Sequence, residues 1–182
     1  MRVLRNLDEL MAYLQLADSV QGCESDMSVL QHSLQCADIL ARDCPDDNEM
    51  QVAGLLHDIG YVLEEANRVS HPLLGAELIK PLFSERIIVG ISLHSEAKRY
   101  LVVKEDGYEK TLTAGSRASL IEQGGGMSGS EQESFKLNRY MPDAVALRRA
   151  DEAAKDAARP TTTLDSWKAK IARCARSEAG CG

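Results

Sequence analysis

An adjacent histidine and aspartate inside an apolar segment constrain the fold of this 182-residue chain more than any other feature. His57 and Asp58 follow Leu55 and Leu56 and precede Ile59, near the end of a segment with helical apolar spacing. Burying an imidazole and a carboxylate is unfavourable unless a metal ion or a hydrogen-bond partner takes up their lone pairs. The pair therefore predicts partners elsewhere in the chain, which contains only three other histidines.

Apolar residues recur at helical spacing along most of the chain, and no segment alternates convincingly with a period of two, so we expect an all-α fold. The length suits one domain, and a hydrophobic content of 44% is enough for its core. We expect a single domain over residues 1–182, with its core at about 27–156, a C-terminal helix at about 163–175 and a frayed tail. Other helices are expected over about 7–17, 27–42, 44–60, 70–81 and 113–123, and from residues 84 and 142 onward.

Charge, hydropathy and cysteine content exclude several classes of protein. The net charge of -7 comes without a basic stripe, which argues against a nucleic-acid partner. The absence of a cleavable signal and of an apolar run near the roughly 20 residues of a membrane span predicts a cytoplasmic protein without a membrane partner. The 5 cysteines are odd in number and lack Cys-x-x-Cys spacing, so we expect reduced thiols.

Six residues that could bind a metal ion lie on or at the ends of five expected helices, and they include every histidine of the chain. Each one alone is more often a core histidine with a hydrogen-bond partner or a solvated acid. The complete set is much harder to explain in that way. The six residues are His32, His57, Asp58, His71, His94 and Asp151.

Four of the six, His32, His57, Asp58 and Asp151, resemble the H…HD…D pattern of the HD-domain superfamily, a helical fold whose members bind metals in the bundle core. Imidazole and carboxylate ligands suit iron, manganese or zinc, and the lack of a thiolate argues against a structural zinc site. A mononuclear HD protein needs only these four residues. As ligands of a second ion, His71 and His94 would complete a binuclear site.

The resemblance extends to residues between the ligands. The chain is similar to the mixed-valent di-iron oxygenases that cleave organophosphonates, which are relatives of myo-inositol oxygenase. The similarity runs from about Val29 to Asp151 and includes the segments QHSLQ (31–35), AGLLHD (53–58), FSER (83–86), HSEAKRYL (94–101) and QGG (123–125).

This resemblance implies a ligand set and a reaction. His32, His57, Asp58 and Asp151 would hold one iron ion, His71 and His94 the other, with Asp58 bridging them. With O2 as co-substrate, the Fe(II)/Fe(III) pair would oxidise C1 of a 1-hydroxyphosphonate, so that the C–P bond breaks to give phosphate and a carboxylic acid.

The resemblance also implies residues that bind the phosphonate. Lys98 and Arg148 would contact its oxygens, and Ser116 and Ser119 would donate from their hydroxyls. Without the resemblance, Lys98 and Arg148 are equally plausible as surface charges. Each lies one helical turn from a ligand, which favours a site that clamps a dianion. Asp58 and Lys98 are the expected catalytic residues.

Departures from the family bear on the substrate. The aminohydroxyethylphosphonate enzymes carry a tyrosine and a glutamate where this chain has Gly22 and Ser25, and a histidine where it has Tyr61. On the simplest alignment the contact to a primary amine is therefore missing. Glu24, Asp26 and Tyr61 would instead offer acidic and aromatic surroundings to a quaternary ammonium.

The expected small-molecule substrate is thus 1-hydroxy-2-(trimethylammonio)ethylphosphonate, which would yield glycine betaine. Hydroxymethylphosphonate is second and the primary amine third. The rival enzyme class is a metal-dependent phosphohydrolase, in which the same ions would activate water. A non-catalytic HD module is less expected, because the whole ligand set is present. The sequence leaves the oligomeric state open.

Overall fold

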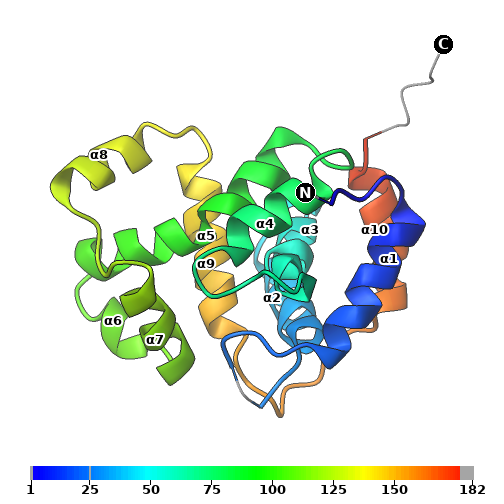
Figure 1. The fold of residues 1–182 in the computed structure, drawn as a ribbon, viewed down its shortest axis with the longest axis horizontal. Coiled ribbons are helices and arrows are strands. Elements are labelled where there is room, and N and C mark those ends of the chain that lie inside the picture. The colour runs from blue at the N-terminus through cyan, green and yellow to red at the C-terminus, as the bar shows by residue number, and fades with distance from the viewer. Residues whose placement is uncertain (1, 25, 177–182) are drawn as a thin grey trace.

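The protein is all-helical in the computed structural model, which describes residues 2–24 and 26–176 (Figure 1). Within these residues the only β-type pairing is an isolated bridge between Gln21 and Ser28, so the expectation of an all-α fold is confirmed. The α-helices are α1 (Leu7–Leu16), α2 (Val29–Asp43), α3 (Asn48–Leu56), α4 (His71–Ile79), α5 (Glu85–Lys104), α6 (Tyr108–Thr111), α7 (Ala114–Glu122), α8 (Gly129–Lys136), α9 (Met141–Ala153) and α10 (Leu164–Cys174), with 3-10 turns η1 (Ala17–Ser19) and η2 (Ile59–Val62).

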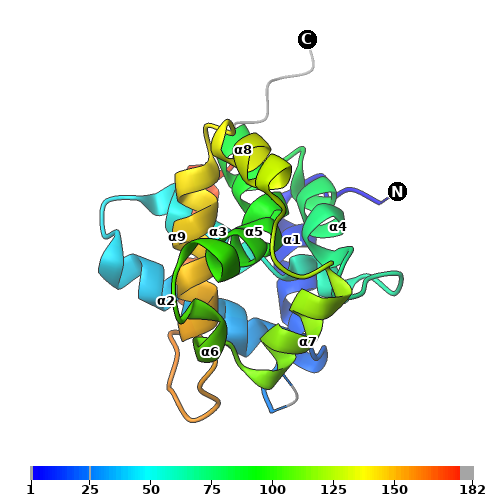
Figure 2. The ribbon, with the colours of Figure 1, turned by 90° about the vertical axis from the view of Figure 1, so that its left-hand side faces the viewer.

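Helices α2, α3, α5 and α9 form the centre of the bundle. α5 packs against α9, α4 and α3, while α2 packs against α3 and α9. α1 and α10 flank the bundle on one side, and α6, α7 and α8 project from the other (Figures 1 and 2). The four central helices therefore lie between two peripheral groups of helices.

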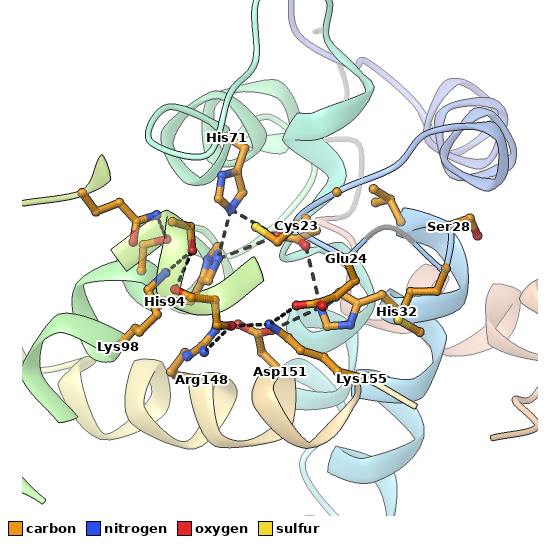
Figure 3. A pocket seen from close by; sticks show the side chains of 18 residues that line it. Cys23, Glu24, Ser28, His32, His71, His94, Lys98, Arg148, Asp151 and Lys155 are labelled. Atoms are coloured by element: carbon orange, nitrogen blue, oxygen red, sulfur yellow. Dashed lines mark hydrogen bonds and ion pairs between the residues drawn. The ribbon is translucent and has the colours of Figure 1, made fainter. Parts of the chain in front are cut away.

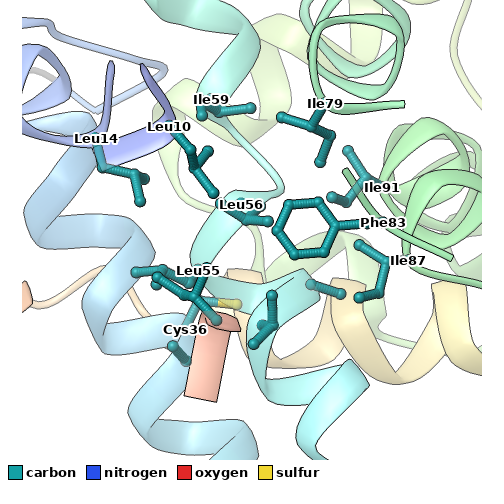
Figure 4. Close-up of a cluster of buried hydrophobic side chains, with 14 of the residues drawn as sticks. Leu10, Leu14, Cys36, Leu55, Leu56, Ile59, Ile79, Phe83, Ile87 and Ile91 are labelled. Atoms are coloured by element: carbon teal, nitrogen blue, oxygen red, sulfur yellow. The ribbon is translucent and has the colours of Figure 1, made fainter. Parts of the chain in front are cut away.

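The largest buried cluster is mostly aliphatic and includes the aromatic rings of Tyr13, Phe83 and Trp167. Figure 4 shows Phe83 among its aliphatic neighbours. Leu55 and Leu56 of α3 pack in this cluster with Ile87 and Ile91 of α5. Leu56 is immediately followed by His57 and Asp58, so the core fixes the segment that carries the pair. Burying a leucine or phenylalanine contributes roughly 1.5–3 kcal/mol, which makes this cluster a firm support for the polar residues beside it.

The helix that precedes the His-Asp pair, α3, is shorter than expected. Its N-cap is Asp47, whose side chain accepts from the Met50 amide, so α3 begins after Cys44 and Pro45 rather than at them. It ends at Leu56, whereas the sequence predicted an end near Gly60. The expected limits of 44–60 are thus wrong, because the chain leaves the helix at His57 and continues as η2.

Contact between η2 and α4 explains this early end. A Cβ atom at Gly60 would lie 2.1 Å from the His71 carbonyl oxygen and 2.8 Å from the Gly75 amide nitrogen. Only glycine permits such a close approach of two backbones. This approach places the first residue of α4, His71, beside Asp58.

Two short helices were not predicted. α6 is a single turn, and α8 buries only Phe135 among its residues, so neither has the apolar stripe that reveals a helix in sequence. α8 does begin with a capping box between Ser128 and Glu131, a local signal that was overlooked. The remaining expected helices lie within a few residues of α1, α2, α4, α5, α7, α9 and α10.

Other expectations have mixed outcomes. No described helix combines the length and apolar character required to cross a membrane. Cys23, Cys36, Cys44 and Cys174 are free thiols, while Cys181 and the expected frayed tail lie outside the described residues. The division of the chain into a single domain stays a prediction.

Candidate metal centre

Six buried side chains converge at the centre of the bundle. α2 provides His32, α5 provides His94 and α9 provides Asp151, while His71 begins α4 (Figure 3). The remaining two residues, His57 and Asp58, lie between α3 and η2. Their ligand atoms form two groups, His32 with His57 and Asp151, and Asp58 with His71 and His94; within each group they lie within 4.8 Å of one another.

Hydrogen bonds fix the orientation of all four imidazoles. Every Nδ1 atom faces a backbone carbonyl oxygen, which can only accept, so Nδ1 carries the proton and Nε2 of the neutral ring keeps its lone pair. The bonds run from His32 to Ala154 (3.0 Å), from His57 to Gly54 (2.8 Å), from His71 to Asn67 (3.1 Å) and from His94 to Ile91 (2.8 Å). Outer hydrogen bonds of this kind are typical of metal-binding histidines.

The Nε2 lone pairs face each other in two pairs. Nε2 of His32 lies 3.1 Å from Nε2 of His57, and Nε2 of His71 lies 3.3 Å from Nε2 of His94. Two acceptors at this distance repel unless a cation or a proton lies between them. Neutral imidazole nitrogens converging with carboxylate oxygens are a suitable donor set for iron, manganese or zinc, so these residues fit metal ions.

Asp58 connects the two groups. Its Oδ1 atom lies 3.2 Å from Nε2 of His71 and 3.7 Å from Nε2 of His94, while Oδ2 lies 3.6 Å from Nε2 of His57 and 3.7 Å from that of His32. One oxygen therefore faces each histidine pair. This is the placement that a carboxylate bridging two ions requires.

The ionisation states also suit metal ligands. Burial raises the pKa of Asp58, but neighbouring histidines, His57 foremost, outweigh burial and hold this pKa well below its usual range. Burial lowers the pKa of His57, and it lowers that of His94 to about 3, with a further contribution from His71. At neutral pH the carboxylate is thus charged and these rings are neutral, which are the states that bind metals.

His32 and Asp151 are more strongly coupled. Burial opposes the charge on His32, yet Asp151 outweighs burial and raises the pKa of the ring. Oδ1 of Asp151 lies 3.1 Å from Nε2 of His32. Burial likewise opposes the charge on Asp151, but Arg148 and Lys155 hold its pKa far below normal.

A cavity with about 440 Å³ of empty space, its mouth included, lies beside the ligands, and four of the predicted phosphonate-binding residues line it. Lys98 Nζ donates to Ser119 Oγ over 2.6 Å, and Arg148 Nη2 donates to Ser116 Oγ over 3.2 Å. Arg148 Nε donates to Tyr108 Oη over 3.0 Å, which fixes the guanidinium plane. Neither cation is a surface charge, because both side chains are buried.

Sequence reasoning missed three residues near this cavity. Lys155, four residues after the ligand Asp151, points into it (Figure 3). Glu152 accepts from Ser116 Oγ over 2.7 Å and pairs with Arg148 and Lys155. Gln123 lines the cavity, and its Oε1 is a buried acceptor without a partner among the described residues. The i, i+4 spacing that revealed Lys98 would also have revealed Lys155.

The expected contacts to a substituent on C2 are only partly brought together. Glu24 lines the cavity, but Tyr61 does not, because its ring stacks on His71 with centroids 4.1 Å apart and its hydroxyl meets Cys23 Sγ at 3.0 Å. Asp26 is exposed to solvent, and Ser25 lies outside the described residues. The aromatic and acidic surroundings expected for a quaternary ammonium are therefore reduced to one carboxylate.

Comparison with known proteins agrees with this geometry. Residues 29–152 match the HD domain family. The chain is 32% identical over 160 residues to a hydroxymethylphosphonate dioxygenase of Gimesia maris, which covers 83% of this chain and 79% of that protein. It is 34% identical over 149 residues to a glycine-betaine-forming [1-hydroxy-2-(trimethylamino)ethyl]phosphonate dioxygenase of Leisingera caerulea, with 78% and 74% covered. An uncharacterised protein, L432 of Acanthamoeba polyphaga mimivirus, is 30% identical over 149 residues, with 76% and 68% covered.

The fold and the site together define a class of protein, namely helical bundles with two His/Asp groups in their centre. The chain belongs to the HD-domain family and, within it, to the phosphonate oxygenases. The family resemblance read from the sequence and the oxygenase class are thereby confirmed.

Proposed function

We propose that this protein uses O2 to cleave the C–P bond of a 1-hydroxyalkylphosphonate at a pair of iron ions, releasing phosphate and a carboxylic acid. The observation that carries the proposal is the position of Asp58, with one oxygen toward each histidine pair, beside a cavity that contains buried cations. The two named phosphonate dioxygenases among its relatives support the same reaction class.

The cations of the cavity suit a phosphonate dianion. Lys98 lies on α5 four residues after His94, and Arg148 lies on α9 three residues before Asp151, so both helices present a cation next to a ligand. Charge-assisted hydrogen bonds from ammonium and guanidinium groups are roughly twice as strong as neutral ones. Ser116 and Ser119 on α7 add two hydroxyl groups to the lining of the cavity.

An Fe(II)/Fe(III) pair held by the six ligands would activate O2 and oxidise C1, so that one oxygen atom enters the carboxylic acid and the other the phosphate. The protein positions the substrate and excludes water from the site. Asp58 keeps the two histidine groups at a fixed separation. Lys98 and Arg148 orient the phosphonate so that C1 lies toward the ligands, and the burial of all six ligands restricts water.

The test is anaerobic reconstitution with iron, followed by measurement of O2 uptake and phosphate release with three substrates, namely hydroxymethylphosphonate, the trimethylammonio compound and the primary amine. We expect about two irons per chain, equal amounts of O2 consumed and phosphate released, and a low-temperature electron paramagnetic resonance signal from a mixed-valent pair. Iron-replete protein that is inert to all three substrates would refute the proposal.

Loading the metal-free protein with a redox-inactive ion separates an oxygenase from a phosphohydrolase. A hydrolase would release phosphate from a phosphate monoester without O2 when loaded with Mn²⁺ or Mg²⁺. We expect no such release, because the His71 and His94 pair adds a second set of donors that a mononuclear hydrolase does not need.

A further inference from the structure

An ion pair between Glu24 and Lys155 lies where residues 22–24 line the cavity. Lys155 Nζ lies 3.3 Å from Glu24 Oε1, and only 5% of the lysine side chain and 18% of the glutamate side chain are exposed. Both residues line the cavity (Figure 3). Neither residue belongs to the two groups of candidate metal ligands.

The lysine is connected to both halves of the site. Its Nζ donates to Ser116 Oγ over 2.6 Å and lies 3.7 Å from Asp151 Oδ1. The same serine accepts from Arg148, which the proposed function places on the phosphonate. The ammonium therefore lies between a metal ligand and a phosphonate-binding hydroxyl, where it adds a third buried cation to those of Lys98 and Arg148.

The glutamate is held in place by α7. Its Oε1 accepts from Thr113 Oγ1 over 2.6 Å, and Thr113 is the N-cap of that helix. A Cβ atom at Gly115 would lie 2.3 Å from the Cys23 carbonyl oxygen and 2.9 Å from Glu24 Oε1. The backbone at residues 23 and 24 thus lies directly on the first turn of α7, so the carboxylate has little room to swing toward a substrate.

We propose that the Glu24–Lys155 pair is a specificity element, an inference that rests on the proposed function. Lys155 serves as a third cation for the phosphonate, and the pair excludes a cationic substituent on C2. The enzyme accordingly prefers 1-hydroxyphosphonates without a cationic substituent, of which hydroxymethylphosphonate is the smallest, over the trimethylammonio compound and the primary amine.

Two features of the cavity support this preference. The carboxylate that the sequence assigned to the ammonium is already neutralised by Lys155, and a second cation beside that lysine would be repelled. A quaternary ammonium also binds best against aromatic rings, yet no Phe, Tyr or Trp is among the described residues that line the cavity. The order of substrates inferred from the sequence is thereby reversed for the first two.

The experiment compares the iron-loaded wild-type enzyme with Lys155→Met, Lys155→Arg, Glu24→Gln and, as a matched control on the exposed side of α8, Lys136→Met. For each protein, kcat/KM is measured with the three substrates, and anaerobic calorimetry gives Kd without turnover. Iron content per chain shows whether a variant still assembles the centre.

We expect wild-type kcat/KM for hydroxymethylphosphonate to exceed that for either cationic substrate by at least about tenfold. Lys155→Met should lower binding and turnover of hydroxymethylphosphonate by about 10- to 100-fold and reduce its advantage over the trimethylammonio compound by at least about tenfold. Lys155→Arg should retain most of the advantage, and Lys136→Met should match the wild type.

Three outcomes would overturn the inference while leaving the proposed function intact. One is an active wild-type enzyme that prefers a cationic substrate. Another is a Lys155→Met variant that loses activity equally on all three substrates, since that marks a purely structural lysine. If Glu24→Gln selectively abolishes turnover of the cationic substrates, the carboxylate binds the ammonium directly and the inference also fails. A wild-type enzyme inert to all three would overturn the inference and the proposed function together.

Discussion

The contact between Gly60 and the first turn of α4 should make the second histidine pair sensitive to a single methyl group. In Gly60→Ala, the new Cβ would lie 2.1 Å from the His71 carbonyl oxygen, whereas ordinary contact begins at 3.4 Å, so the backbones must separate by about 1.3 Å. The opposing atoms at His71 and Gly75 are backbone atoms, which cannot rotate away. The strain must therefore move α4 relative to η2.

The size of the effect follows from this geometry. Overpacking in a core costs about 1–3 kcal/mol, and two backbone clashes at one site should place Gly60→Ala near or above that limit, at about 2–4 kcal/mol. A shift of α4 also withdraws His71 from Asp58 while His32, His57 and Asp151 stay together. We expect the iron content to fall from about two toward one per chain.

Gly90 provides the matched control. It lies within α5, where an added Cβ meets nothing within 4 Å, and an alanine in a helix interior is favoured over glycine by about 0.5–1 kcal/mol. Urea unfolding of the metal-free proteins gives the free energies, and elemental analysis of the reconstituted proteins gives the iron content. The reasoning is refuted if Gly60→Ala unfolds within about 0.5 kcal/mol of the wild type and still binds two irons.

Three further predictions follow from individual contacts. Burial, with Arg148, lowers the pKa of Lys98 to about 8, so its charge is lost as pH rises through that value. KM for the phosphonate should therefore rise up to about tenfold between pH 7 and 9, and steady-state kinetics should show no such rise in Lys98→Arg. Arg86 donates to Asp47 and Asp143, and Arg86→Gln should lower the free energy of unfolding by about 1–2 kcal/mol in urea titrations. Chelation of the metal should lower Tm in calorimetry, because ligands that bind only the folded state stabilise it.

Local sequence signals predicted most of the helices but not where tertiary contacts end them. α5 has both an apolar face and the N-cap Ser84, whose hydroxyl accepts from the Ile87 amide, and its start was predicted correctly. The end of α3 was not, because it depends on the packing of Gly60 against α4, which is a contact between segments distant in sequence. The peripheral α6 and α8 bury too little to leave a periodic pattern.

The candidate metal-binding residues could be picked out from the sequence because few residues qualify. The chain has 4 histidines, and the His-Asp pair requires partners for its lone pairs wherever it is buried. The sequence could not show that every Nδ1 faces a carbonyl oxygen or that each oxygen of Asp58 faces a different histidine pair. The second feature depends on how α2, α4 and α5 are placed around Asp58.

Helical spacing and loop conformation determine different parts of the site. α5 carries Lys98 four residues after the ligand His94, and Lys155 follows the ligand Asp151 by the same interval just beyond the end of α9. One helical turn places a cation beside each of these two candidate ligands, so in the proposed function the helices determine where the anionic end of the substrate binds. The orientation of Glu24 instead depends on its contact with Thr113, which lies 89 residues away. Substitutions of Glu24 or of its ion-pair partner Lys155 should therefore change which substituent on C2 is accepted. Loss of Lys98 should instead weaken binding of every phosphonate.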